Sequence, residues 1–352
     1  MIDILKKAVA RGASDIMMIA GLPVAYKIEG RICREDAPRL TPADTRGYAE
    51  KLYAMASERS MDTLLKTGDD DFSFSLPGLA RFRVNALKQR GSLGLIIRVV
   101  TFSLPDGHAL GIPRAVMELI NRPKGLVLIT GSAGSGKSTT LACMVDEINR
   151  SRNAHIITIE DPIEFLHTHK MSIVTQREIS TDTLSYDIAL RAALRESPDI
   201  ILLGEMRDPD TIRAAVTAAE TGHLVISTLH TMSAASTIDR VIDVFPPAQQ
   251  HQIRTQLSQV LEGVACQQLI PGVDGRLRPA FEIMTATPAV RNLIRESKTH
   301  QLNSAIAADS SMVSMDQSVL QLCRQGAISE NQAISHAVDM EWMKRRLNAP
   351  GA

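Results

Sequence analysis

From Gly125 onward, short apolar runs alternate with stretches in which apolar residues recur at helical spacing. Short apolar runs are typical of strands buried on both faces of a parallel sheet, and the amphipathic stretches are typical of the helices that cover it. The predicted order is strand 125–130, helix 137–149, strand 155–160, helix 187–195, strand 200–203, helix 210–219 and strand 224–228. From about Pro288 the pattern is mostly helical. We therefore expect an α/β domain built on a parallel sheet.

The first hundred residues follow a different pattern, in which short helices mix with short strands of alternating polarity. The clearest strand signals are at 24–28, 71–75 and 93–100. A stretch rich in Pro and Gly follows and is typical of a linker or hinge, and a helix is predicted after it at 114–121. The predicted division is an α+β domain over 1–101, a linker over 102–113 and the α/β domain over 114–352.

The composition is that of an ordinary globular chain. Its 352 residues carry 39 basic and 39 acidic side chains, 44% hydrophobic and 3% aromatic residues. This excludes a disordered or collagen-like chain, and the balanced charge argues against a polycationic protein that coats nucleic acid. No apolar run approaches the roughly 20 residues needed to span a bilayer. The four cysteines lie far apart and no signal peptide is recognised, so we expect no disulfide framework and a cytoplasmic protein.

A glycine-rich motif lies between the first strand and the first helix of the second domain. Residues 131–138 match G-x-x-x-x-G-K-[ST], a loop whose backbone N–H groups cradle phosphates at a helix N-terminus. Lys137 is expected to reach the β- and γ-phosphates of ATP, and Ser138 to bind Mg²⁺. The predicted nucleotide-binding residues here are Gly131, Ser132, Ala133, Gly134, Ser135, Gly136, Lys137, Ser138 and Thr139.

Acidic residues follow two of the predicted strands. Glu205 comes after strand 200–203 and is the candidate general base that polarises the attacking water. Many P-loop ATPases have an Asp before this Glu, but here the residue is Gly204, so the acid on the Mg²⁺ side must come from elsewhere. Because the carboxyl ends of parallel strands meet at one edge, Glu160 and Glu164 are the candidates, with Glu160 binding Mg²⁺ directly or through water.

Two histidines, His223 and His230, flank the strand 224–228. A single His is more often structural than functional, and no Cys or third His at ligand spacing indicates zinc. A His at a strand end can instead sense the γ-phosphate or contact a neighbouring subunit. We include His230 among the catalytic candidates and His223 among the nucleotide-binding ones.

Several motifs closely resemble those of the secretion ATPases of type IV pili and type II secretion. Residues 157–164 correspond to the family's Asp box and residues 204–208 to its atypical Walker B motif. Residues 219–223 and 228–231 correspond to its His box. The segment 289–296 (Ala-Val-Arg-Asn-Leu-Ile-Arg-Glu) is similar to the retraction motif of the PilT-type ATPases. Two positions depart from the family: Ile16-Met17-Met18 stands where a His-containing stretch is usual, and Ser132-Ala133 replaces Pro-Thr.

The resemblance implies a RecA-like P-loop ATPase core with an N-terminal PAS-like domain, assembled as a homohexamer. Such a motor hydrolyses ATP to drive pilus disassembly and twitching motility. The resemblance also implies that arginines of the N-terminal domain reach the nucleotide, and Arg81, Arg83 and Arg98 lie in the matching stretch. The implied partners are the inner-membrane platform protein of the pilus machine and a paralogous retraction ATPase, at the pilus base. No nucleic acid and no zinc are expected.

Three alternatives stay open at this stage. The first is a pilus assembly or type II secretion ATPase, although its tetracysteine zinc site is missing here. The second is a RecA-like nucleic-acid translocase, which needs aromatic stacking residues, whereas the chain has one Trp, four Tyr and seven Phe. The third is a nucleotide-binding regulator without turnover, against which Glu205 argues.

The neutral total conceals two halves of opposite charge. Residues 1 to 105 carry 16 basic and 12 acidic side chains, a net +4, whereas residues 106 to 352 carry 23 and 27, a net −4. Opposite charges of this kind favour a head-to-tail ring in which one subunit's N-terminal domain docks on its neighbour's ATPase domain.

Overall fold

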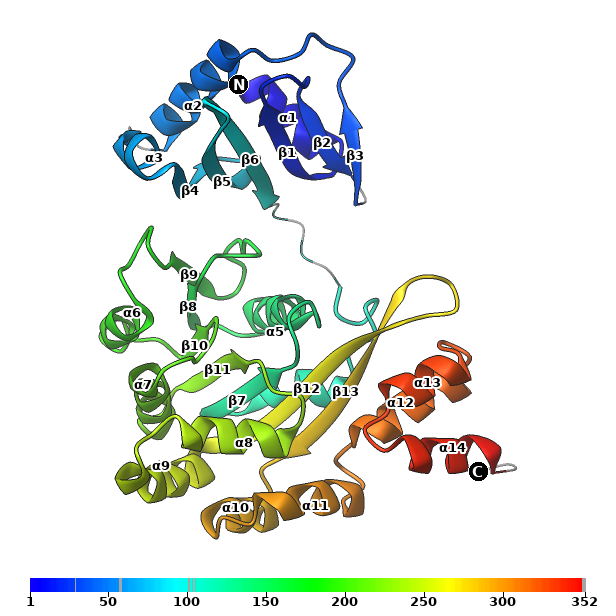
Figure 1. Cartoon of the computed structure of the whole chain (residues 1–352). Coiled ribbons are helices and arrows are strands. Elements are labelled where there is room, and N and C mark those ends of the chain that lie inside the picture. The colour runs from blue at the N-terminus through cyan, green and yellow to red at the C-terminus, as the bar shows by residue number, and fades with distance from the viewer. Residues whose placement is uncertain (29, 57–58, 101, 103, 105, 350–352) are drawn as a thin grey trace. The chain divides into compact units, whose positions relative to one another are not determined.

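The computed structural model describes residues 1–28, 30–56, 59–100, 102, 104 and 106–349 (Figure 1). The chain divides into two compact units, residues 1–104 with 164–168, and residues 105–163 with 169–352. Of the predicted linker 102–113, positions 103 and 105 lie outside the described residues. No helix in the described part of the chain is long and apolar enough to cross a membrane.

The first unit is a six-stranded antiparallel sheet with three helices, in the strand order β3-β2-β1-β6-β5-β4. Alternation along β5 buries residues such as Phe82 and leaves Arg81 and Arg83 on the opposite face of the sheet. This is the predicted α+β arrangement. Its elements are α1 (Ile2–Ala10), β1 (Ala13–Ile19), β2 (Ala25–Ile28), β3 (Arg31–Arg34), α2 (Pro42–Met55), α3 (Asp62–Thr67), β4 (Asp69–Leu76), β5 (Ala80–Gln89) and β6 (Ser92–Val100).

The second unit is built on a seven-stranded sheet in the order β13-β12-β7-β11-β10-β8-β9. Its strands are β7 (Gly125–Thr130), β8 (His155–Glu160), β9 (Ile173–Glu178), β10 (Ile200–Leu203), β11 (Leu224–Leu229), β12 (Leu261–Pro271) and β13 (Leu277–Thr285). Its helices are α4 (Arg114–Met117), η1 (Glu118–Asn121), α5 (Lys137–Ser151), α6 (Tyr186–Ala193), α7 (Pro209–Glu220), α8 (Ala234–Asp243), α9 (Pro247–Val260), α10 (Pro288–Arg295), η2 (Thr299–Gln301), α11 (Leu302–Ala308), α12 (Met315–Arg324), α13 (Glu330–His336) and α14 (Met340–Asn348).

The predicted elements of this unit are confirmed to within two residues at each end. The four predicted strands are parallel to one another, as expected. The sheet also contains β13, which was not predicted and which pairs antiparallel with β12 as a hairpin. The sequence pattern did not indicate this hairpin because polar residues such as Gln267 and Glu282 interrupt its apolar runs.

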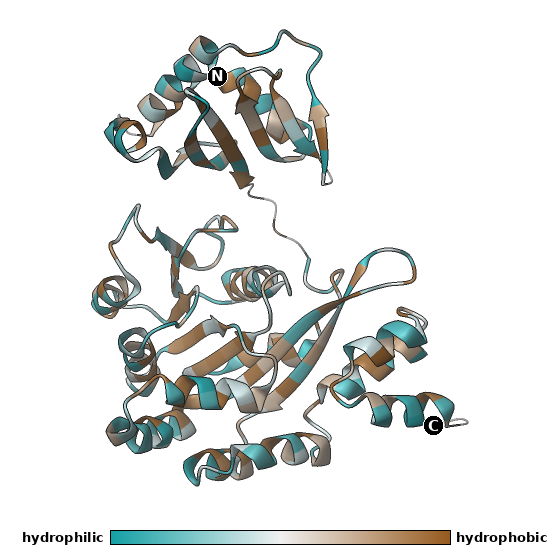
Figure 2. Ribbon diagram, in the orientation of Figure 1, coloured by the Kyte–Doolittle hydropathy of each residue, from teal (hydrophilic) through white to brown (hydrophobic). Residues whose placement is uncertain are grey.

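Helices cover both faces of this sheet, so its central strands are apolar on both sides, as the hydropathy colouring shows (Figure 2). On one face, Val127 and Ile129 of β7 share a core with Leu141 and Met144 of α5. On the other face, alternate residues of the same strand, beginning with Leu126, share a core with α7, α8, α9 and the C-terminal helices. The carboxyl ends of β7, β11, β10 and β8 therefore meet at one edge, where the candidate chemistry lies.

Candidate active site

The phosphate loop connects β7 to α5 and packs against β12. Gly131, Gly134 and Gly136 all have positive φ, which favours glycine. A Cβ on Gly131 would lie 2.2 Å from the Gln267 carbonyl oxygen, so the loop touches the β12 backbone there. Gln267 also accepts a 2.8 Å hydrogen bond from the Thr140 hydroxyl of α5. The buried Gln267 therefore braces both the loop and the helix that follows it.

Lys137, the first residue of α5, bends back over the loop. Its Nζ donates to the carbonyl oxygens of Gly131 and Ser132 at 2.8 and 2.9 Å. Burial lowers the pKa of Lys137, and the Glu205 carboxylate opposes that shift. The Ser135 hydroxyl is buried with no hydrogen-bond partner among the described residues. An open loop of amides, a lysine above it and an unpartnered hydroxyl fit a bound phosphate chain.

Glu205 lies at the centre of the strand edge and is only 8% exposed. Its Oε1 pairs with Nε of Arg207, and its Oε2 lies 3.4 Å from Nε2 of His230. The Thr228 hydroxyl of β11 donates to the carbonyl oxygen of Gly204, which joins the ends of β10 and β11. The structure therefore brings together the predicted base Glu205 and His230, and adds Arg207 as the direct ion-pair partner.

Glu160, the last residue of β8, lies at the same edge. Its neighbour Ile159 pairs with Leu203, the last residue of β10. Glu160 therefore lies one residue past the last β8–β10 pair, at the carboxyl end of the sheet. Oε1 of Glu160 accepts from the Thr158 hydroxyl at 2.6 Å and from Nε2 of Gln176 at 3.2 Å. Glu164 follows on an exposed position in the segment 164–168, which groups with the first unit.

The hydroxyl of Ser138 is exposed on the first turn of α5, beside the phosphate loop. Mg²⁺ in nucleotide sites keeps several waters and binds through one or two protein groups together with phosphate oxygens. The hydroxyl on the phosphate-loop helix and the Glu160 carboxylate at the end of β8, on the same edge of the sheet, are oxygen donors of that kind. The chemistry of these two oxygen donors therefore fits Mg²⁺.

His223 does not lie at this edge. It precedes β11, where its backbone carbonyl accepts from the Gly125 amide at the start of β7 and its Nδ1 lies 2.9 Å from the Ala218 carbonyl oxygen. A six-residue strand spans about 20 Å, so His223 is at the opposite edge of the sheet from the phosphate loop. The expectation that His223 binds the nucleotide of its own subunit is corrected accordingly.

The three predicted arginines of the first unit share one face of its sheet. Arg83 of β5 and Arg98 of β6 are direct cross-strand partners. Nε of Arg98 donates to Asp15 at 3.3 Å, and Nη1 of Arg81 donates to Ser75 at 3.5 Å. Like charges directly opposite each other destabilise a sheet, so the Arg83–Arg98 pair costs stability that Asp15 offsets in part.

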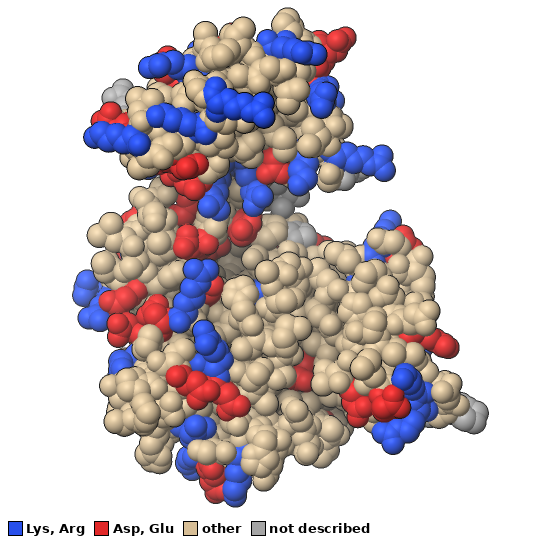
Figure 3. All heavy atoms as spheres, viewed as in Figure 1, with Lys and Arg blue, Asp and Glu red and all other residues tan. Residues whose placement is uncertain are grey.

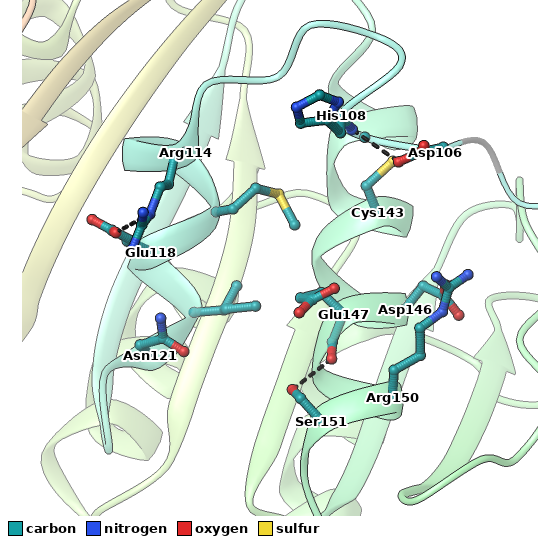
Figure 4. A pocket seen from close by; sticks show the side chains of 13 residues that line it. Asp106, His108, Arg114, Glu118, Asn121, Cys143, Asp146, Glu147, Arg150 and Ser151 are labelled. Carbon is teal, nitrogen blue, oxygen red and sulfur yellow. Dashed lines mark hydrogen bonds and ion pairs between the residues drawn. The ribbon is translucent and has the colours of Figure 1, made fainter.

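A cavity of about 320 Å³ lies beside the C-terminal half of α5 (Figure 4). Its lining includes Asp106, Glu118, Cys143 and Arg150. Cys143 comes six residues after Lys137, which is about 9 Å along a helix axis. The cavity is therefore distinct from the phosphate loop.

Two residues of the site were not predicted from the sequence. Tyr186, at the start of α6, lies near Asp161, Glu160 and Glu205, and burial together with these carboxylates raises its pKa, so the phenol stays neutral. Gln267 was missed because β12 was not predicted. In the sequence it is one of two adjacent glutamines between apolar residues, and this pattern does not indicate which residues the side chain contacts.

Comparison with known proteins agrees with this geometry. The family model for the type II/IV secretion system protein matches residues 1–279. The chain is 45% identical over 333 residues to the type IV pilus retraction ATPase PilT of Pseudomonas aeruginosa, covering 94% of this chain and 96% of that protein. A twitching motility protein of Neisseria gonorrhoeae is 42% identical, with 97% and 92% covered. The crystal structure of the pilus retraction motor PilT with bound ADP is 46% identical, with a TM-score of 0.90 over 98% of this chain and 99% of that one. The chain therefore belongs to the type II/IV secretion system protein family and is an ATP-hydrolysing P-loop ATPase of the pilus-retraction type.

Proposed function

We propose that this ATPase works as a homohexameric motor whose ATP hydrolysis powers type IV pilus disassembly and twitching motility. The observation that carries the proposal is the cluster of Glu205, Arg207 and His230 at the strand edge beside the phosphate loop. A regulator that only binds nucleotide has no need of a buried carboxylate at that position. Near full-length similarity to proteins named for pilus retraction and twitching supports the mechanical role.

The residues at the carboxyl edge of the second sheet have different roles in hydrolysis. Glu205 accepts a proton from the attacking water, and its buried position holds the carboxylate in one orientation. Lys137 leaves the loop carbonyls to bind the β- and γ-phosphate oxygens, and His230 faces the γ-phosphate end of the site. Ser138 and Glu160 would hold Mg²⁺, which would neutralise charge on the phosphates.

The arginines of the first unit are proposed to complete a nucleotide site in the assembled ring. Arg81, Arg83 and Arg98 lie on one sheet face, and an arginine finger raises hydrolysis about 10³- to 10⁵-fold in well-studied cases. On the visible face of the first unit, basic side chains are scattered over a mostly uncharged surface and acidic ones are fewer, whereas the second unit carries both signs (Figure 3). The net charges of +4 and −4 support a head-to-tail contact between subunits.

The proposed place of work is the cytoplasmic side of the inner membrane at the pilus base. There the ring acts on the platform protein of the pilus machine. A paralogous retraction ATPase is a further proposed partner, because the type IV pilus ATPase PilU of Pseudomonas aeruginosa is also similar, at 37% identity over 337 residues.

Gene deletion in the host tests the proposal. Retraction predicts hyperpiliated, non-motile cells that the wild-type gene rescues and a Glu205→Gln gene does not. Bald cells would instead indicate an assembly ATPase. Stimulation of the purified ATPase by single-stranded DNA, lost at high salt, would indicate a nucleic-acid translocase and overturn the proposal.

A further inference from the structure

A row of polar side chains crosses the buried face of the second sheet next to the phosphate loop. Thr130, Cys266 and Glu282 are cross-strand neighbours on β7, β12 and β13. The Thr130 hydroxyl donates to the Cys266 sulfur at 3.0 Å, and the thiol hydrogen-bonds to Glu282. Burial raises the pKa of the Cys266 thiol to about 12, so it remains a donor. The row begins at the residue immediately before Gly131.

Glu282 ends this row and connects the N-termini of two helices. It is 6% exposed, and its Oε1 accepts a 2.7 Å hydrogen bond from the amide of Ala234. The amide of Met315 also lies near this carboxylate and helps to lower its pKa. Ala234 and Met315 are the first residues of α8 and α12, whose opening amides have no partner within the helix. One buried carboxylate therefore accepts from the start of α8 and lies near the start of α12, at the positive end of both dipoles.

The same network reaches the loop that carries His230. The hydroxyls of Thr231 and Thr237 lie 2.7 Å apart, and Thr237 donates to the Ser233 carbonyl at 2.7 Å. Thr237 is fully buried in the first turn of α8 and also contacts the Cys266 thiol. The α8 N-terminus, held by Glu282, therefore holds the residue that directly follows His230.

Burial of a carboxylate is costly unless it is fully hydrogen-bonded. Burial raises the pKa of Glu282, and the two helix amides and the thiol oppose that shift. An apolar side chain would avoid the cost but would leave the amide of Ala234 without its acceptor. The position thus serves to fix two helix ends relative to one strand.

We propose that Glu282 is a positioning residue for ATP hydrolysis. By anchoring the start of α8 it holds the loop 230–233, and with it His230, against Glu205. Through Met315 it ties that loop to the C-terminal helices, so that a change at the nucleotide reaches α12. The proposal rests on the role proposed above for His230.

The first test compares Glu282→Gln with wild type in steady-state ATP hydrolysis. Glutamine has nearly the same volume, but its NH₂ group is a donor and cannot accept from a helix amide. We expect kcat to fall about tenfold or more, because small displacements of catalytic groups have effects of that size. KM and the affinity for ADP should change little, because Gln267 still braces the phosphate loop. An unchanged kcat in a folded protein would overturn the proposal.

Asp316→Asn is the matched control. Asp316 neighbours Met315 and accepts from the amides of Val338 and Asp339, so it ties α12 to the start of α14 without contacting α8 through these bonds. Its charge also raises the pKa of Glu282, so the variant removes a neighbouring like charge but leaves the bond from Glu282 to α8 in place. We therefore expect kcat to stay within about twofold of wild type, since the His230 loop keeps its anchor. A loss equal to that of Glu282→Gln would show that general loosening of the C-terminal helices is the cause, and would overturn the proposal.

A double-mutant cycle covers the case in which Glu282→Gln folds poorly. Thr237→Val removes the bond to Thr231 with little change in volume. It should lower kcat by itself, and its effect should be less than additive with that of Glu282→Gln, because both act through one loop. Full additivity of the two effects on kcat would contradict the proposal that both residues act through the loop 230–233.

A His230→Ala variant, measured in parallel, separates this proposal from the role proposed for His230. A normal rate in that variant overturns both, whereas a slow His230→Ala beside a normal Glu282→Gln overturns this one alone.

Discussion

The hydroxyl of Tyr186 occupies the space into which a side chain at position 204 would project. A Cβ on Gly204 would lie 2.8 Å from Tyr186 Oη and 3.4 Å from the Cα of Glu160. The restriction is one of space, because Gly204 is not among the residues with positive φ. An acid before Glu205 would therefore require the Tyr186 hydroxyl to shift. We propose that the carboxylate of Glu160, on the adjacent strand β8, serves the Mg²⁺ side of the site.

Gly204→Ala should therefore displace Glu205. We expect destabilisation of about 1–3 kcal/mol from overpacking and a fall in kcat of about tenfold or more. Tyr186→Phe removes the colliding oxygen, so the double variant Gly204→Ala/Tyr186→Phe should recover both stability and turnover. Thermal unfolding and steady-state ATPase assays measure the two effects. A double variant no better than Gly204→Ala would show that the Tyr186 hydroxyl is not the obstacle.

The nucleotide chemistry was readable from the sequence because each of its motifs is short and local. The phosphate loop could be predicted from residues 131–138 and the strand and helix next to them in sequence. Glu205 could be predicted from the strand that it directly follows. Tyr186, Gln267 and Glu282 act across strands that are distant in sequence, and no local pattern pairs them with their partners. His223 shows the opposite error: the motif containing it lies close in sequence to His230, but the strand between the two histidines separates them to opposite edges of the sheet.

Glu205→Gln should separate binding from turnover. The amide keeps the volume of the buried side chain and can still contact Arg207, but it cannot accept the proton from water. We expect kcat to fall about 10²- to 10⁴-fold while ATP affinity and assembly stay near wild type. Equilibrium binding of a fluorescent ATP analogue and phosphate release measure the two properties. Turnover close to wild type would remove Glu205 as the general base.

Lys137→Ala should instead weaken nucleotide binding. In the structure Nζ is held by the Gly131 and Ser132 carbonyls, so the ammonium is already positioned over the loop. Loss of a charge-assisted contact to phosphate costs about 1.5–3 kcal/mol, which is roughly a 10- to 150-fold rise in Kd for ATP. Thr139→Ala, on the same helix turn, is a control expected to bind with smaller loss. Unchanged affinity in Lys137→Ala would contradict the assignment of the phosphate loop.

Removal of Mg²⁺ should stop hydrolysis and reveal the role of Ser138. We expect a chelator to abolish turnover and added Mg²⁺ to restore it, because few protein groups hold the ion and exchange is open to solvent. Ser138→Ala should raise the Mg²⁺ concentration needed for half-maximal rate, whereas Ser132→Ala, on the exposed loop tip, should not. Equal Mg²⁺ dependence in the two variants would argue that Ser138 is not a ligand.

Reversal of one arginine in the first unit should change stability and activity in opposite directions. Arg83 faces Arg98 across the β5–β6 pair, so Arg83→Glu replaces a repulsive pair with an attractive one. We expect the unfolding free energy to rise by about 0.2–1 kcal/mol. If the arginine group serves the nucleotide in the ring, ATPase activity should nevertheless fall by at least about tenfold. Arg34→Glu, on the edge strand β3 of the same sheet, reverses an equal charge away from this group and should leave turnover near wild type. Denaturant unfolding and ATPase assays on the three proteins measure these effects. An equal loss of activity in both variants would show that the ring requires net charge and not the Arg83 position, and activity near wild type in both would contradict the role of the arginine group.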